Sequence, residues 1–176
     1  MEATKLFARR GYHKTTVADI ASAIGMTQGA LFHHFPSKDA LLQAVVERLA
    51  RGMDSYRAPL AEGGSADAVR KIVNLMVEHF NRQPEATICL AALATEFAGT
   101  DDPILERIRR IYDRFVDPFA IVLSTHPTVR DPRAAAISFI GAVQGIAIQG
   151  LLREGNPPLA ALAPAFLDMM NMPVKW

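Results

Sequence analysis

Residues 16–38, TVADIASAIGMTQGALFHHFPSK, decide the fold. Thr16 and Asp19 have the spacing of a capping box, in which a hydroxyl and a carboxylate satisfy free backbone N–H groups at the start of a helix. That helix is expected to end before Gly25, because a glycine permits a tight turn. Thr27 then suits the N-cap of a second short helix, which the proline after its apolar pattern closes. The stretch therefore predicts two short helices joined by a sharp turn.

Apolar side chains at helical spacing indicate how these two helices pack. Ile20 and Ile24 lie one turn apart on the first helix, and Leu31 and Phe35 lie one turn apart on the second. The two pairs can meet if the helices cross steeply, and the small side chain of Ala21 lets the helices come close. The spacing therefore predicts a helix-turn-helix unit.

The first turn of the second helix is expected to face away from this core. Its side chains, from Thr27 through Gln28 and Gly29 to Ala30, are short enough to enter a DNA major groove. Gln28 can hydrogen-bond an adenine edge, and Ala30 can touch a thymine methyl group. The expected phosphate contacts come from Lys14, Thr16, Thr27 and Lys38. These residues predict binding to double-stranded DNA, although a helical interaction module that does not bind DNA fits the same spacing.

The rest of the chain also has helical periodicity and no strand-like alternation, which predicts an all-α protein. The first expected helix ends at Gly11. The others are expected at residues 16–24, 28–35 and 37–56, and at about 66–82, 84–98, 103–124, 132–153 and 158–171. Residues 61–67, AEGGSAD, are expected to form a linker.

The longer run LFARRGYHKTTVADIASAIGMTQGALFHHFPSKDALLQAV, residues 6–45, resembles the N-terminal head of the tetracycline-repressor (TetR) family. The family pattern is aliphatic-Phe, Gly-Tyr, Thr-Thr, Ile-Ala, Gly-aliphatic, Gly-x-Leu-Tyr-x-His-Phe, Lys and Leu, and nearly every element is present in order and without gaps. The resemblance implies a repressor that a small apolar effector releases from a palindromic operator. It divides the chain into a DNA-binding domain at residues 1–40, with the helix-turn-helix at about 16–35, and a helical ligand-binding and dimerisation domain at residues 41–176.

Three further residues take their expected roles from this resemblance. Phe32 stands where the family usually has a tyrosine, so the phenolic hydroxyl that commonly contacts a phosphate is missing. His33 aligns with a variable position that faces the groove, and His34 aligns with a histidine near the DNA backbone. All three are therefore predicted to lie at the DNA interface.

The uncharged segment at residues 134–152 predicts a homodimer interface. Its length suits a membrane span, but three polar side chains and three glycines interrupt it and a DNA-binding head precedes it, so no membrane partner is expected. The resemblance implies that the helices at about 132–153 and 158–171 form a four-helix dimer bundle. The predicted interface residues are Gly141, Gly145, Ile148, Leu151 and Leu152, with the two glycines allowing close contact between helices.

A small-molecule site is expected to be an apolar cavity with a few polar groups. The candidate lining residues are Met76, Phe80, Phe97, Tyr112, Phe115, Phe119 and Gln144. For each of them, plain core packing is the alternative interpretation.

Composition indicates the cellular setting. The chain has 176 residues and 50% hydrophobic content, which is enough to bury a sizeable core. Residues 1–57 carry eight Lys or Arg against five Asp or Glu, and the remainder carries eleven against thirteen, so the N-terminal part is weakly basic and fits a surface that faces phosphates. A single cysteine and the lack of a signal-peptide pattern indicate a cytoplasmic protein.

The sequence does not predict an enzyme. It lacks a Ser-His-Asp signature, a glycine-rich phosphate loop and a paired-carboxylate motif. His33 and His34 point in different directions on a helix and no ligand cluster completes a site, so neither a metal nor another cofactor is expected. A regulator that senses thiols or electrophiles through Cys89 is an alternative, but Cys89 lacks an adjacent Lys, Arg or His that would lower its pKa.

Overall fold

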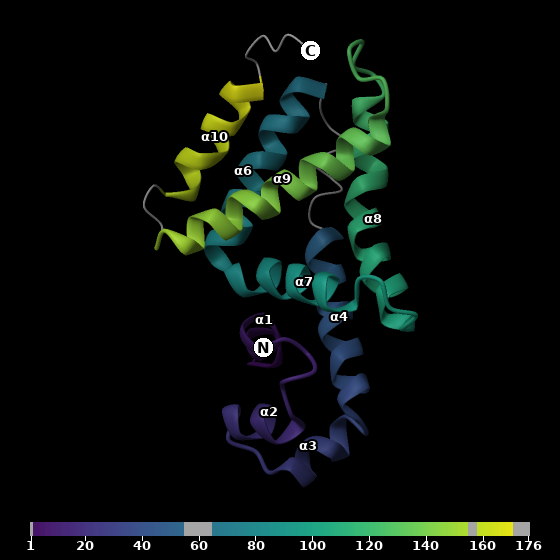
Figure 1. Cartoon of the computed structure of the whole chain (residues 1–176), viewed down its shortest axis with the longest axis vertical. Helices are drawn as coiled ribbons and strands as arrows, with labels where there is room; N and C mark the ends of the chain where they lie inside the picture. The colour runs from purple at the N-terminus through teal and green to yellow at the C-terminus, as the bar shows by residue number, and fades with distance from the viewer. Residues whose placement is uncertain (1, 55–64, 155–157, 171–176) are drawn as a thin grey trace. The chain divides into compact units, whose positions relative to one another are not determined.

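The computed structural model describes residues 2–54, 65–154 and 158–170, and all regular structure within them is helical, as the periodicity predicted. The helices are α1 (Glu2–Arg10), α2 (Val17–Ala23), α3 (Gln28–His34), α4 (Lys38–Asp54), α6 (Ser65–Arg82), α7 (Pro84–Phe97), α8 (Pro103–Leu123), α9 (Pro132–Leu152) and α10 (Leu159–Met170) (Figure 1). Each expected helix is present, with ends within two residues of the prediction. The linker expected at residues 61–67 lies largely outside the described residues, and α6 begins within it.

The chain forms two compact units that do not follow the order of the sequence. The first contains residues 1–57 and 83–115, and the second contains residues 58–82 and 116–176, so α8 contributes to both. Helix α4 runs without a break through the domain boundary predicted between residues 40 and 41. That boundary stays a prediction.

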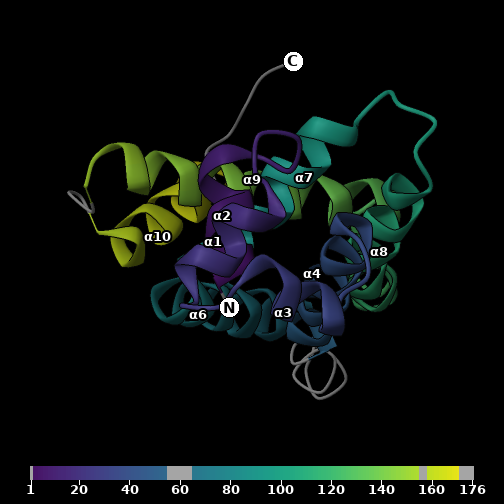
Figure 2. The same cartoon turned by 90° about the horizontal axis from the view of Figure 1, so that it is seen from below.

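In the first unit, α1 packs against α2, α4 and α7, and α2 packs against α3. One continuous core joins Phe7 of α1, Val45 of α4, Leu93 of α7 and Ile108 of α8, all of which are fully buried. The view in Figure 2 shows how the chain passes from α2 through α3 into α4. Burial of apolar surface from helices far apart in the sequence therefore stabilises the N-terminal head.

In the second unit, α10 packs against α9 and α6. The ring of Phe119 near the end of α8 lies 5.0 Å from that of Phe139 on α9, measured between centroids. Helix α9 buries Ala136, Ile140, Ala147 and Gly150, which are four, seven and three positions apart and define one buried face. Among the described residues, α9 is the one helix whose length and composition would allow a membrane span, and 22% of its most apolar window is buried within this chain.

One packing expectation is wrong. Ile24 was expected to pair with Ile20 in the core, but its side chain is 42% exposed. Helix α2 ends at Ala23, and Ile24 is its C-cap with φ −108° and ψ 8°. Because the backbone leaves the helical path there, Ile24 does not continue the buried face on which Ile20 lies.

Candidate nucleic-acid interface

Helix α2 begins with the predicted capping box. The Asp19 N–H donates to Thr16 Oγ1 at 3.0 Å, and the Thr16 N–H donates to Asp19 Oδ2 at 2.8 Å. The Thr16 hydroxyl also donates to Asp19 Oδ2 at 2.6 Å. These bonds from the hydroxyl and backbone of Thr16 hold the pKa of Asp19 below its ordinary value. The start of α2 is thus fixed by residues only three positions apart.

The turn between α2 and α3 is equally well defined. Gly25 has φ +69°, a left-handed conformation that L side chains rarely adopt. Thr27 then caps α3, because its Oγ1 accepts the Ala30 N–H at 3.2 Å. Buried Ala21 and Leu31 bring the two helices together, as the sequence predicted. Turn, cap and core contact therefore set the orientation of α3 relative to α2.

The first turn of α3 and the residues that follow are open to solvent. Thr27, Gln28, Gly29, Ala30, His33 and His34 are all exposed, as are Lys14 and Thr16. Phe32 is 38% exposed, which leaves part of a large aromatic ring in water. The structure therefore brings most of the predicted DNA-binding residues to the surface of one small head, and their contact with DNA stays a prediction.

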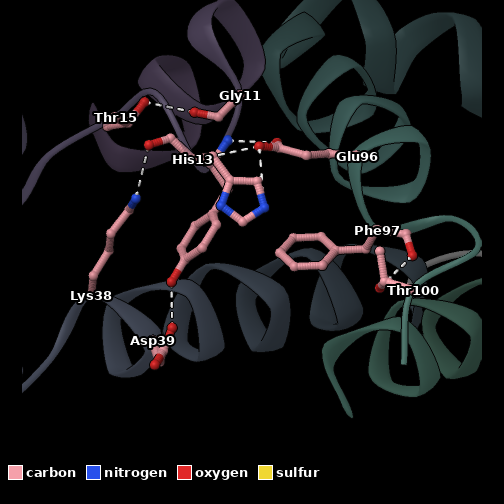
Figure 3. A network of polar contacts seen from close by, with 9 residues as sticks. Gly11, His13, Thr15, Lys38, Asp39, Glu96, Phe97 and Thr100 are labelled. Atoms are coloured by element: carbon pink, nitrogen blue, oxygen red, sulfur yellow. Dashed lines mark hydrogen bonds and ion pairs between the residues drawn. The ribbon is translucent and has the colours of Figure 1, made fainter. Parts of the chain in front are cut away.

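The side chain of Lys38 contacts the turn between α1 and α2. Its ammonium donates to the His13 carbonyl oxygen at 3.3 Å (Figure 3). It also lies 4.1 Å from the centroid of the Tyr12 ring. The Tyr12 hydroxyl donates a hydrogen bond to Asp39. Burial is the main cause that raises the pKa of Tyr12 well above its ordinary value, and the hydrogen bond to Asp39 is the second. An ammonium has three donors, so these contacts leave capacity for a phosphate.

Glu96 of α7 accepts two backbone N–H groups from the turn between α1 and α2 (Figure 3). The Tyr12 N–H donates to Oε2 at 2.6 Å and the His13 N–H donates to Oε1 at 2.7 Å. Gly11 precedes them with φ +77°, and successive N–H groups next to a left-handed residue form a site for an anionic group. The ring of Phe97 lies 5.6 Å from that of Tyr12 and 5.7 Å from that of His13. Sequence reasoning missed Glu96, because 84 positions separate it from Tyr12 and no local pattern marks it.

The candidate ligand residues are divided between the two units. Phe97, Tyr112 and Phe115 belong to the first unit, and Met76, Phe80, Phe119 and Gln144 belong to the second. Phe97, Phe115 and Phe119 are fully buried, and Phe97 packs against the rings of the head described above. Whether these residues contact a ligand stays a prediction.

The candidate dimer residues lie along the exposed face of α9. Gly141, Gly145, Ile148, Leu151 and Leu152 are all exposed, with Leu152 at 70%. A Cβ added at either glycine would have no described atom within 4 Å. This face is therefore open to a second helix, and its place in a dimer interface stays a prediction.

Cys89 is buried in α7, and burial raises its pKa to about 12. A thiol with that pKa is almost entirely protonated at neutral pH, whereas the thiolate is the reactive species. The structure thus argues against the alternative in which Cys89 senses electrophiles.

Comparison with known proteins agrees with the features of the head. The model of the family described as bacterial regulatory proteins, tetR family, matches residues 2–45, which extend from α1 into α4. The nucleoid occlusion factor SlmA of Actinobacillus pleuropneumoniae is 28% identical over 142 residues, which cover 77% of this chain and 69% of that protein. The transcriptional repressor DhaR of Mycobacterium sp. strain GP1 is 24% identical over 162 residues, which cover 89% and 82%.

The fold extends this similarity beyond the head. The crystal structure of AibR in complex with isovaleryl coenzyme A and operator DNA superimposes with a TM-score of 0.77 at 23% identity, covering 95% of this chain and 92% of AibR. At this identity the comparison shows a shared fold, which includes the helical region behind the head.

Proposed function

Because the chain belongs to the tetracycline-repressor (TetR) family of bacterial regulators, we propose that it is a cytoplasmic repressor that binds a palindromic operator and is released from it by a small apolar effector. The observation that carries the proposal is the exposed first turn of α3. The Thr16 and Thr27 caps and the packing of α2 against α3 hold this turn in place. The protein acts by binding rather than by catalysis.

Base recognition falls to the start of α3. Gln28 is exposed, and the cap of α3 is made by Thr27 rather than by Gln28. Its amide NH₂ group can therefore donate to N7 of an adenine, and its amide oxygen can accept from the N6 amino group of the same base. Ala30 supplies a methyl group for thymine contact, and Gly29 lets the backbone approach the groove. Lys14, Thr16, Thr27, Phe32, His33, His34 and Lys38 flank this turn and contact the phosphate backbone or the groove wall.

A two-fold dimer supplies the specificity that one head lacks. A single short helix reads few base pairs, whereas two equivalent helices about 34 Å apart can enter successive major grooves of a palindrome. The open face of α9 offers the contact surface, because Gly141 and Gly145 permit close approach and Ile148, Leu151 and Leu152 provide apolar area. Burial of this face in a dimer also explains why so apolar a helix is exposed in one chain.

The effector is proposed to bind in the region behind the head. AibR, which shares this fold, was crystallised with isovaleryl coenzyme A, an apolar acyl group on a polar carrier. The residues proposed to contact it in this chain are Met76, Phe80, Phe97, Tyr112, Phe115, Phe119 and Gln144. They combine aromatic surface with one amide, which suits a mainly apolar ligand.

Selection of bound sequences from random DNA duplexes tests the proposal. We expect an inverted repeat to be enriched, and its complex with the protein should survive an excess of unrelated competitor DNA in a gel shift. Sedimentation at micromolar concentration should show a dimer. Enrichment of no sequence, or binding that competitor DNA abolishes, would instead support a helical interaction module without a DNA target.

A further inference from the structure

The carboxylate of Glu96 lies where its own helix disfavours an acidic group. Glu96 is the last residue but one of α7, and the C-terminal end of a helix carries partial negative charge. Its side chain is 20% exposed, so water screens that repulsion only weakly. The group is compensated from outside α7, by the N–H groups of Tyr12 and His13 at 2.6 and 2.7 Å. We call these two hydrogen bonds the Glu96 bridge.

The turn that receives the Glu96 bridge leads directly into the helix-turn-helix. Thr15 Oγ1 donates to the Gly11 carbonyl at 2.7 Å, and the Thr15 N–H donates to the Tyr12 carbonyl at 3.1 Å, so the turn is internally bonded. The next residue, Thr16, is the N-cap of α2, and α2 packs against α3. A restraint applied at Tyr12 is therefore passed to α3 through residues that are hydrogen-bonded to, or packed against, one another.

We propose that Glu96 is a positioning residue, which fixes the orientation of the DNA-binding head on α7 and thereby sets operator affinity without contacting DNA. The affinity of a protein for its ligand falls in proportion to the fraction of molecules in the competent conformation. Loss of the bridge lets the head adopt other orientations, and both heads of a dimer must be competent at once. This inference rests on the proposed DNA-binding function.

Glu96→Gln is the test variant, because it keeps the shape of the side chain. One carboxylate oxygen becomes an NH₂ group, which faces a backbone N–H instead of accepting from it, so one of the two bonds is lost. Glu106→Gln is the matched control: it removes the same charge from the same unit, at an exposed site on α8 where Glu106 pairs with Arg109 and Arg110.

Operator affinity should respond to the first variant only. Measured on the operator recovered from the duplex selection, Glu96→Gln should bind about tenfold more weakly and Glu106→Gln within about twofold of the wild type. The dependence of affinity on salt should have the same slope in all three proteins, because no phosphate contact is removed. Wild-type affinity in Glu96→Gln, or a loss shared equally by both variants, would overturn the proposal.

Hydrogen exchange on the free protein tests the bridge without DNA. The amides of Tyr12 and His13 should exchange slowly in the wild type and at least about tenfold faster in Glu96→Gln, while amides in the middle of α7 keep their rates. Fast exchange at both amides in the wild type would overturn the inference, and this result is decisive even if the variant fails to fold. If the wild type binds no operator, the proposed function is refuted. The exchange rates of Tyr12 and His13 would then still show whether the Glu96 bridge forms.

Discussion

Replacement of Gly11 by alanine separates two reasons why the turn between α1 and α2 requires glycine. Gly11 has φ +77°, and a side chain in this left-handed region costs about 1–2 kcal/mol. The added Cβ would also lie 2.9 Å from Glu96 Oε2, so the carboxylate would have to move. Because that oxygen accepts the Tyr12 N–H at 2.6 Å, the movement weakens a hydrogen bond to a charged group, worth about 1.5–3 kcal/mol. We expect Gly11→Ala to lower the free energy of unfolding by about 2–4 kcal/mol.

Gly25→Ala is the matched control for this experiment. Gly25 has a similar φ of +69°, but an added Cβ would meet no described atom within 4 Å, so only the backbone cost of about 1–2 kcal/mol applies. Urea denaturation followed by circular dichroism, at one fixed protein concentration, gives both values. The reasoning is refuted if Gly11→Ala costs no more than Gly25→Ala. It is also refuted if the excess persists in a Glu96→Ala background, where the carboxylate oxygen is absent.

Four further predictions follow from the proposed roles. Gln28→Ala should weaken operator binding by roughly 1–3 kcal/mol in a gel shift and relax the preference at one base pair. Gln43→Ala, which changes an exposed glutamine on α4, should leave binding unchanged. An equal loss on all sequences would show that Gln28 contacts only the DNA backbone. Lys38→Ala should lower affinity on all sequences and reduce the slope of log affinity against log salt by about one ion, and an unchanged slope would remove Lys38 from the phosphate contacts. Burial raises the pKa of Cys89 from 9.0 to about 12, so above pH 9 unfolding releases its proton and stability falls. Relative to Cys89→Ala, the wild type should lose about 1.4 kcal/mol of unfolding free energy between pH 8 and 10, and a constant difference would contradict the burial of the thiol. Gly145→Glu should place a charge on the proposed dimer face and give monomers with little specific DNA binding, and a variant that sediments as a dimer would move the interface away from this part of α9.

The start and end signals of the helices were accessible to sequence reasoning because they are local. The Thr16–Asp19 capping box, the Thr27 cap and the left-handed Gly11 and Gly25 depend on residues within a few positions of each other. The buried spacing of Ile20 and Leu31 follows from the helical period in the same way. The exception, Ile24, shows the limit of periodicity, because a side chain keeps its expected face only while its backbone remains helical.

The amino-acid sequence by itself determined that this chain is all-α and that a helix-turn-helix lies near its N-terminus, since caps, turns and apolar period act over a few residues. Only the tertiary structure decided that Glu96 holds Tyr12 and His13, and that Lys38 lies on the ring of Tyr12. It also decided that residues 83–115 join the N-terminal head in one compact unit. The physical reason is that such contacts depend on how several helices pack together. A carboxylate that lies 84 positions from its donor belongs to no local sequence pattern, so neither helical periodicity nor capping motifs predict the contact.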